Sequence, residues 1–437
     1  MQLEDMILVS VDDHICEPAD MWDNHLPAKW KDRAPRFEHL EDGSDVWVFD
    51  GRQMPNVGLN AVVGRPPDEY GMEPTAISQL RKGCYDVHAR IDDMNANGML
   101  GSLCFPSVPG FVGELFGRHD DKDLARALIQ AYNDWHVDEW CAAYPGRFIP
   151  LALPMLWDPE LMAEEVRRMA SKGCHAMTFA DSPRGLGRPS LHDESWEPFW
   201  KACDEEGTIV CIHIGSGGTL SLEDDRAPIE VMMAATPISI FSCATDLVFS
   251  KFLRRYPNLK IALVEGGTGW VPYFLERLDY THEHHRAWTK LDLGGKKPSE
   301  IFREHIITCF IDDVAGIEMR DHIGIENITW ECDYPHSDTP WPHAPEILWK
   351  SIQGLSETEI DQITHLNAMK HFRYDPFSVI PREECSVAAL RAKAAHVDVS
   401  PRSAGGGKSP SDYASGHCTI GDVKQQLSKA PSVAFVK

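Results

Sequence analysis

The sequence predicts an α/β fold, a distorted (β/α)8 barrel with an insertion after its first strand and an extension at its C-terminus. Short apolar segments alternate with helical segments along most of the chain, and this alternation is typical of a parallel sheet. Several segments are almost continuously hydrophobic, as expected of strands buried on both faces. A doubly wound open sheet is the alternative, but no glycine-rich dinucleotide fingerprint favours it.

Eight segments have the length and the β-branched, apolar composition of strands. They cover residues 7–14, 99–106, 148–155, 174–180, 208–215, 260–266, 306–311 and 327–334. Helices are expected between them, for example over 122–143 and 159–171, where Pro159 suits a first helical turn. Eight strand–helix units fit a barrel with insertions.

Two regions depart from this alternation. Residues from about 18 to 85 are rich in Trp, Pro and Asp, and 45–51 predicts a small hairpin arm within them. Residues 381–437 are rich in Ala, Ser, Gly and Pro and carry a net charge of +3, which leaves −28 for the rest of the chain. We expect one barrel domain over 1–380. The low-complexity extension is expected either to be disordered or to lie along its own or a neighbouring subunit.

The composition excludes several classes of protein. Acidic side chains number 67 against 42 basic ones, for a formal net charge of −25. Such a surface repels phosphate backbones and anionic lipid, so neither nucleic acid nor a membrane is an expected partner. No apolar run approaches the roughly 20 residues of a membrane span. Acidic residues near the start argue against a signal peptide, and the 12 cysteines show no CxxC spacing, so we expect a cytoplasmic protein.

Four of the predicted strands end in a histidine or a carboxylate. These strand ends carry Asp12 and His14, His213, Glu265, and Asp333. In a barrel the active site lies at the C-terminal ends of the strands, and residues two apart on a strand, such as Asp12 and His14, project to the same side. One such histidine is usually a satisfied polar residue, but four agreeing strand ends predict a metal site, because burying these groups unpaired is costly.

The motifs around these positions are DDHICEP at 12–18, YNDW at 132–135, CIHIG at 211–215, VEGGTGWVP at 264–272, WECDYPH at 330–336 and NAMKHF at 367–372. In these motifs the chain resembles the amidohydrolase-related (amidohydrolase 2) family of metal-dependent TIM barrels. The resembling branch contains aminocarboxymuconate semialdehyde decarboxylase and the γ-resorcylate and 5-carboxyvanillate decarboxylases. The resemblance covers residues from about 6 to 375 and implies a divalent metal in the mouth of the barrel.

The resemblance also implies roles for individual residues. Asp12, His14 and His213 match metal ligands, and Asp333 matches an aspartate that binds metal or takes part in proton transfer. Decarboxylase relatives usually carry a histidine where this chain has Glu265. Glu265 is therefore either a further ligand or a group that orients His213.

Further positions complete the expected site. His285, in the helix predicted over 275–288, matches a histidine of relatives that share the Glu-Gly-Gly motif. The expected metal ligands are then Asp12, His14, His213, Glu265, His285 and Asp333, with His213, Glu265 and Asp333 as catalytic groups. Ser216, in a glycine-rich loop that suits an anion, and His336 are the candidates for substrate binding.

The leading hypothesis is a metal-dependent hydrolase or carboxy-lyase (decarboxylase) acting on a small organic acid or amide-like molecule. A mononuclear site would favour zinc. Three carboxylates and three imidazoles would also suit a dinuclear iron or manganese site. The second hypothesis is accordingly an oxygen-activating hydroxylase working with a homologous partner subunit, and the third is a non-catalytic metal-binding partner. We expect a homo-oligomer or a hetero-oligomer with a homologous subunit.

Overall fold

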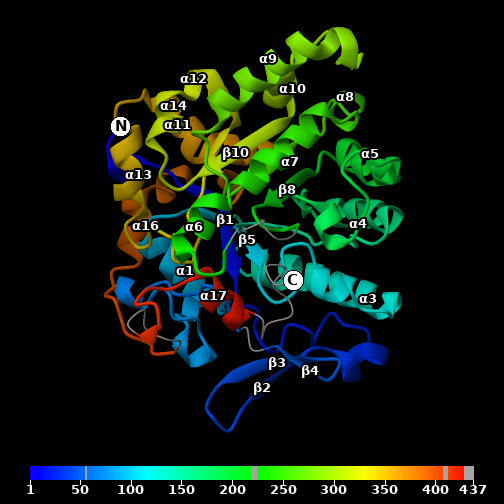
Figure 1. Ribbon diagram of the computed structural model, residues 1–437. Coiled ribbons are helices and arrows are strands. Elements are labelled where there is room, and N and C mark those ends of the chain that lie inside the picture. The colour runs from blue at the N-terminus through cyan, green and yellow to red at the C-terminus, as the bar shows by residue number, and fades with distance from the viewer. Residues whose placement is uncertain (55–56, 218–223, 407–411, 428–437) are drawn as a thin grey trace.

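A computed structural model gives the arrangement of the chain, and it describes residues 1–54, 57–217, 224–406 and 412–427 (Figure 1). Each of the eight segments predicted as strands contains a parallel strand. These strands are β1 (Val9–Ile15), β5 (Gly101–Pro106), β6 (Phe148–Ile149), β7 (Ala176–Thr178), β8 (Ile209–His213), β9 (Ile261–Val264), β10 (Ile306–Phe310) and β11 (Ile328–Trp330).

The parallel strands form two sheets rather than one continuous sheet. One has the order β1-β5-β6 and the other β11-β10-β9-β8-β7. A single parallel bridge between Ala152 and Met177 joins the first sheet to β7. At the other edge, the Asp333 amide donates to the Asp12 carbonyl at 2.8 Å and the His14 amide donates to the Tyr334 carbonyl. The eight parallel strands therefore lie side by side in sequence order, and only a few backbone hydrogen bonds join the two sheets.

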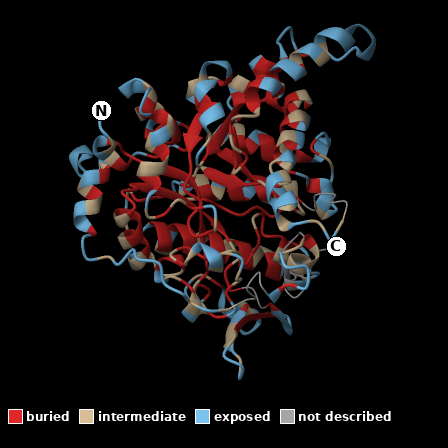
Figure 2. Ribbon diagram, turned by 60° about the vertical axis from the view of Figure 1, so that its left-hand side comes forward, coloured by how far each residue is buried: buried red, intermediate tan, exposed pale blue. Residues whose placement is uncertain are grey.

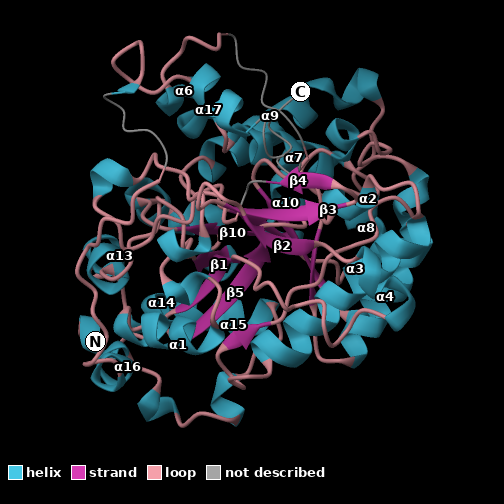
Figure 3. Ribbon diagram, turned by 90° about the horizontal axis from the view of Figure 1, so that it is seen from below, coloured by secondary structure: helices cyan, strands magenta, loops and turns pink. Residues whose placement is uncertain are grey.

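A hydrophobic core lies between the strands and continues from one sheet into the other. It contains Val9, Val11, Leu103, Phe105, Ile149, Ala176, Ile209, Cys211, Ala262, Val264, Ile307 and Cys309, all of them buried. A larger core on the outer side packs the strands against the helices. Seen from below, the helices surround the strands (Figure 3), and buried residues fill the centre of the molecule (Figure 2).

Helices follow most strands. The longer ones are α1 (Val87–Ala96), α3 (Lys122–Trp135), α4 (Pro159–Ser171), α5 (Glu197–Glu206), α7 (Ile238–Phe249), α9 (Val271–Thr289), α10 (Pro298–His305) and α13 (Ala344–Ile352). Shorter ones are α2 (Glu114–Gly117), α6 (Ile229–Ala235), α8 (Phe252–Arg255), α11 (Val314–Glu318), α12 (Arg320–Ile323), α14 (Glu357–Asp361) and α15 (Asn367–His371). Asp158 caps α4 by accepting from the amides of Glu160 and Leu161, and Pro159 begins the helix as predicted.

The region after β1 contains a small antiparallel sheet. β2 (Arg36–His39), β3 (Asp45–Phe49) and β4 (Arg52–Met54) pair in this order, with Trp47 opposite Phe37 and Met54. The β3–β4 pair lies at the position of the predicted hairpin, and β2 adds a third strand to it. β3 is buried along its whole length, so its Trp47 belongs to the main core rather than to an exposed arm.

The described part of the C-terminal extension packs on its own chain. α16 (Val387–Lys393) begins where the Val387 amide donates to the Met6 carbonyl, and Arg391 pairs with both oxygens of Glu346. Further on, Thr419 forms an antiparallel bridge with Pro228, and α17 (Ile420–Leu427) lies beside α6. These contacts place described parts of the extension against the body of the chain.

One helical stretch differs from the sequence analysis. Ile229–Phe249, which spans α6 and α7, is long and apolar enough to cross a membrane, with a mean hydropathy of 1.5, whereas no such run was expected. Length and composition alone make this weak evidence, because a core helix passes the same test. Within its most apolar window of 18 residues, 33% of the residues are buried inside the protein.

Candidate metal centre

Side chains from the ends of three strands converge at one point. Asp12 and His14 lie on β1, His213 ends β8, and Asp333 follows β11. His14 Nε2 is 3.5 Å from Asp12 Oδ1 and 3.3 Å from Asp333 Oδ1, and His213 Nε2 is 3.6 Å from Asp12 Oδ2. All four side chains are buried. Two overlapping groups of ligand atoms result: one from Asp12, His14 and His213, the other from His14, Asp333 and His336.

These four side chains hold buried polar atoms that form no regular hydrogen bond within the described chain, although Asp333 Oδ1 has His336 Nδ1 at 2.8 Å and His213 Nε2 has Glu265 Oε2 at 2.9 Å. Both oxygens of Asp12 and of Asp333, both ring nitrogens of His14 and Nε2 of His213 are buried without a hydrogen-bond partner. Leaving one buried polar atom unpaired costs about 1–3 kcal/mol, and here seven such atoms face one another. Carboxylate oxygens and imidazole nitrogens are ligands of divalent cations, so this donor set fits a divalent metal.

An irregularity in β1 precedes the ligands. Ser10 is opposite Ser102 of β5, but Asp13, three residues on, is opposite Cys104, two residues on, so β1 contains one extra residue. Asp13 lies on the outer side of the strand, where its carboxylate accepts hydrogen bonds from the Ser102 hydroxyl and from the Tyr334 amide. The adjacent Asp12 turns toward the metal centre.

The electrostatics of the centre disfavour charge on Asp12 and His14. Burial, together with the neighbouring carboxylates of Glu331 and Glu265, raises the pKa of Asp12 well above its usual value. Burial and the nearby His336 and His213 lower the pKa of His14 well below its usual value. A neutral imidazole is the form that binds metal. A metal cation among the carboxylates would stabilise the ionised form of Asp12, which burial otherwise disfavours.

The tautomer of His213 leaves one ring nitrogen with a lone pair that a metal could use. Its Nδ1 lies 2.8 Å from the Ile214 carbonyl, which can only accept, so Nδ1 carries the proton and Nε2 presents a lone pair. Glu265 Oε2 lies 2.9 Å from that same Nε2. The acceptor atoms Nε2 of His213 and Oε2 of Glu265 then face each other. This places Glu265 in the position of a further metal ligand, and not beside Nδ1, where a group that orients the ring would lie.

His336 also reaches the centre. Its Nδ1 lies 2.8 Å from Asp333 Oδ1, and its ring centroid is 3.8 Å from that of His14. Burial alone would lower the pKa of His336, but the adjacent Asp333 carboxylate outweighs it and raises the pKa to about 9. The residue therefore brings a positive charge to the centre at neutral pH.

Glu331 is a carboxylate to which the sequence analysis gave no role. Its Oε2 accepts from the Glu265 amide at 3.2 Å and lies against Cys309 Sγ. Burial raises its pKa to about 8. Glu331 precedes Asp333 by two residues within the segment predicted as a strand, so alternation would have predicted the same side for both, although β11 itself ends at Trp330.

An aromatic wall borders the ligands. The ring of Phe111 is stacked on His213 with centroids 4.1 Å apart, and Phe105 meets the same imidazole edge-on at 5.1 Å. Phe105 lies near the C-terminal end of β5. Phe111 belongs to the loop that follows, and no motif in the sequence indicated that Phe111 would reach the centre. The wall offers a flat apolar surface beside the metal ligands.

Two predicted site residues are not brought to the centre. His285 lies on the exposed outer part of α9, where its Nδ1 accepts from Trp288 Nε1 at 3.1 Å. Ser216 is buried, and its hydroxyl donates to the His213 carbonyl at 2.7 Å and accepts from the Asp181 amide at 3.0 Å. These bonds give Ser216 a part in fixing the loop after β8 instead of a free hydroxyl.

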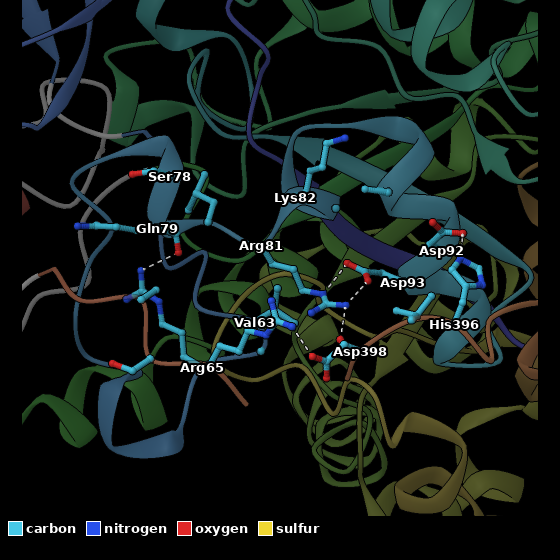
Figure 4. Close-up of a pocket in the computed structure, with 18 residues that line it drawn as sticks. Val63, Arg65, Ser78, Gln79, Arg81, Lys82, Asp92, Asp93, His396 and Asp398 are labelled. Carbon is cyan, nitrogen blue, oxygen red and sulfur yellow. Dashed lines mark hydrogen bonds and ion pairs between the residues drawn. The ribbon is translucent and has the colours of Figure 1, made fainter. Parts of the chain in front are cut away.

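A separate cavity of about 580 Å³ lies between the region after β1, α1 and the C-terminal extension (Figure 4). On its wall Arg81 makes two hydrogen bonds to the carboxylate of Asp93, at 2.8 and 2.7 Å. Asp93 in turn accepts from the Tyr334 hydroxyl at 2.6 Å. This network supports the loop that carries Asp333 from behind.

The chain is similar to known proteins of one family. A sequence model of the amidohydrolase family matches residues 50–374. The γ-resorcylate decarboxylase of Rhizobium sp. (strain MTP-10005) is 26% identical over 336 residues, which are 72% of this chain and 94% of the relative. That of Rhodococcus jostii (strain RHA1) is 25% identical and covers 66% of this chain and 88% of its own.

Solved structures show the same fold. An amidohydrolase from Mycobacterium avium subsp. paratuberculosis K-10 has a TM-score of 0.62 at 21% identity, covering 84% of this chain and 99% of its own. The 5-carboxyvanillate decarboxylase of Novosphingobium aromaticivorans, complexed with manganese and a nitrobenzoic acid, has a TM-score of 0.59 at 20% identity, covering 85% and 99%. These neighbours imply a TIM-barrel fold, and the matched model shows that the chain belongs to the amidohydrolase family.

Proposed function

We propose that the protein is a metal-dependent carboxy-lyase that removes the carboxylate of a small aromatic acid. The observation that carries the proposal is the convergence of seven buried polar atoms from Asp12, His14, His213 and Asp333, which form no regular hydrogen bond, beside an aromatic wall. Relatives named γ-resorcylate decarboxylase support the reaction class.

The proposed ligands are Asp12, His14, His213 and Asp333, with Glu265 as a fifth. When bound, a divalent metal would polarise the oxygens of the substrate. The ring of the substrate would pack against Phe111, and the cationic His336 would attract its carboxylate.

Decarboxylation breaks the bond between the ring carbon and the carboxylate, releases carbon dioxide and places a proton on that carbon. The resemblance to decarboxylases implies a histidine with an acid/base role at the position that Glu265 holds here. We propose that the Asp333–His336 pair, 2.8 Å apart, supplies the proton instead.

The test combines metal analysis with product detection. Protein loaded with manganese or zinc would be incubated with 2,6-dihydroxybenzoate, 5-carboxyvanillate and a set of related acids, and carbon dioxide release would be measured. We expect release from at least one acid, loss of activity in His213→Ala and Asp333→Asn, and full activity in the control His192→Ala, which alters an exposed histidine outside the centre. A fully metal-loaded protein that released carbon dioxide from none of these acids would contradict the proposal.

A second function has its own supporting observation. The two ligand groups overlap at His14, and Glu265 and Glu331 add further carboxylates, a composition that suits a dinuclear iron or manganese site. Elemental analysis separates the two functions. About one metal per chain favours the carboxy-lyase, whereas about two redox metals with oxygen consumption favour an oxygen-activating hydroxylase.

A further inference from the structure

The cavity between the region after β1, α1 and the C-terminal extension is separate from the metal centre (Figure 4). Residues 63–65 and 78–83 form one part of its wall, and residues 396–398 and 402–404 of the extension form another. None of the proposed metal ligands lines it. Its volume of about 580 Å³ is that of a pocket for a small organic molecule. The cavity is therefore a place where a ligand could bind outside the proposed reaction.

The wall of this cavity is more basic than the rest of the protein. Four lysine and arginine side chains and three aspartates line it, an excess of one positive charge, whereas the whole chain carries −25. The basic residues are Arg65, Arg81, Lys82 and Arg402, and the acidic ones are Asp92, Asp93 and Asp398. A concave site of positive charge concentrates anions, so the wall favours a negatively charged ligand.

Most of the charges on the wall already have a partner of opposite sign. The pairs are Arg81–Asp93, Arg402–Asp398, Lys82–Asp86 and His396–Asp92. Among the described residues, Arg65 differs from the other cations of the wall, because its hydrogen bonds go only to backbone carbonyls and it forms no ion pair. The excess positive charge of the cavity is thus that of Arg65.

Arg65 is a buried cation whose hydrogen-bonding groups are only partly used. Its side chain is 3% exposed. Nη1 donates to the Met72 carbonyl and Nη2 to the Gln79 carbonyl at 3.4 Å, while Nε has no hydrogen-bond partner in the described chain. Arg90, which is also buried, donates with all three of its nitrogens. The guanidinium of Arg65 therefore retains donors for a further acceptor.

The carboxylates nearest to Arg65 do not compensate its charge. Burial lowers the pKa of Arg65, and the charges of Glu69 and Glu73 act against this effect from beyond ion-pair distance. Each of these two carboxylates accepts a hydrogen bond from a backbone amide instead. A buried charge without a counter-charge is costly, so an anion bound in the cavity would stabilise Arg65.

The rest of the wall favours an organic anion over an inorganic one. Val63, Leu80, Ala89 and Val397 line the cavity beside the charged groups, and the volume is several times what one phosphate ion fills. The planar fork of an arginine binds carboxylates and phosphates in the same way, so Arg65 alone does not distinguish them. A carboxylate on an apolar body, however, fits both the charged and the apolar parts of the wall.

We propose that this cavity binds a small organic carboxylate, with its acid group against Arg65 and its apolar body along Val63 and Val397. The ligand contacts the body of the chain and the C-terminal extension at the same time, and its binding therefore holds the extension against the body. The site is distinct from the metal centre, and it does not depend on the reaction that takes place there.

The first test measures binding to the metal-loaded, full-length protein by titration calorimetry. Benzoate, hexanoate and succinate are the carboxylate probes, inorganic phosphate is the inorganic one, and benzyl alcohol is the uncharged control. We expect at least one carboxylate to bind, phosphate to bind more weakly than it does, and benzyl alcohol to give no signal. Failure of all three carboxylates to bind, or tighter binding of phosphate than of each of them, would overturn the proposal.

Variants then assign the binding to this cavity. Arg65→Met should raise the dissociation constant of the carboxylate by about tenfold or more, because it removes the charge that pairs with the acid. Lys82→Glu reverses an exposed charge on the wall and should raise the constant by about threefold without affecting folding, so it decides the case if Arg65→Met does not fold. Lys201→Glu is the matched control, because both lysines are exposed and pair with a carboxylate four residues on, at 3.2 and 3.7 Å.

We expect unchanged binding in Lys201→Glu and also in His213→Ala, which alters the metal centre. An unchanged dissociation constant in Lys82→Glu, or loss of binding in His213→Ala, would show that the carboxylate binds elsewhere. Circular dichroism verifies that each variant is folded.

Hydrogen exchange of the backbone amides gives the position of the ligand directly. In the presence of saturating carboxylate, amides within 63–65, 78–83 and 396–404 should exchange more slowly, because the ligand contacts these segments and stabilises the state in which they are closed. Protection confined to the loops that carry His213 and Asp333 would place the ligand at the metal centre, and no protection of the extension would show that the ligand does not hold it. Either result would overturn the proposal.

Discussion

Two clusters of buried polar side chains lie on opposite sides of β1, and they differ in how their atoms are satisfied. Asp12 and Asp13 are neighbours in sequence, and both are fully buried. Neither oxygen of Asp12 has a partner, whereas Asp13 accepts from the Ser102 hydroxyl and the Tyr334 amide. The inner cluster requires something from outside the chain, while the outer cluster is complete.

The outer cluster continues through Arg90, which is fully buried. All three of its guanidinium nitrogens donate to atoms of the same chain, to the Gly83 carbonyl, the Cys104 sulfur and the His14 carbonyl. The type of residue alone therefore does not identify a metal ligand. A group of unsatisfied polar atoms that face one another does identify a binding site, because buried polar atoms are left unpaired only where a bound group satisfies them.

The largest expected effect comes from breaking the outer cluster. Arg90→Met removes three buried hydrogen bonds and a cation that acts on Asp13, which should cost about 3 kcal/mol of unfolding free energy, because the acceptors that it leaves stay buried. Urea denaturation of the metal-free protein measures this. The matched control is Arg126→Met, whose exposed ion pair with Glu164 should contribute less than about 1 kcal/mol. Equal losses in the two variants would remove the distinction between the clusters.

Breaking the inner cluster should affect metal binding rather than folding. Asp12→Asn removes a charge that burial and the neighbouring carboxylates disfavour, so the metal-free variant should be no less stable than the wild type. Its affinity for divalent metal should fall by more than about 100-fold, since even indirect contacts to a metal ligand are worth 10–100-fold. Competition with a metal indicator measures the affinity. Retained wild-type affinity would place the metal elsewhere.

A single buried polar atom that lies apart from both clusters should have an effect of intermediate size. His136 is fully buried, its Nε2 has no described partner, and burial lowers its pKa to about 3. The unfolded chain binds a proton near pH 6.5 and the folded chain does not, so stability should fall as the pH decreases from 6.5 toward 3, by about 2 kcal/mol at pH 5. Relative to the wild type, His136→Leu should reduce this dependence in unfolding measurements at pH 5 and pH 7. An identical pH dependence in both proteins would contradict the expectation.

The smallest effect concerns a single hydrogen bond of the outer cluster. Ser102→Ala leaves Asp13 with the Tyr334 amide and Arg90 nearby, so the loss of unfolding free energy should be about 1 kcal/mol. Thermal unfolding measures the shift, and metal affinity should not change. A large drop in metal affinity would show that the two clusters are coupled through β1.

Hydrophobic patterning was sufficient to locate the eight strands, because strands buried on both faces leave continuous apolar runs. The strand ends then located Asp12, His14, His213, Glu265 and Asp333, which the structure brings together. Phe111 could not be predicted, since a loop has no periodicity from which to read its direction. His285 was expected at the centre, and the structure places it on the exposed outer part of α9; a position on a helix gives no information about how far the helix projects from the barrel.

The extra residue in β1 decides which aspartate faces the centre. Ile7, Val9 and Val11 point into the core between the sheets, and unbroken alternation would send Asp13 inward next, with Asp12 and His14 facing the outer layer. The extra residue reverses the alternation of the strand. Odd-numbered residues before it therefore face the hydrophobic core, and even-numbered residues after it face the metal centre. The number of residues that precede Asp12 on the strand therefore decides whether Asp12 or Asp13 faces the metal centre. A deletion of one residue before Asp12 would turn Asp12 and His14 to the outer side and Asp13 to the inner side, although every proposed ligand would still be present in the sequence.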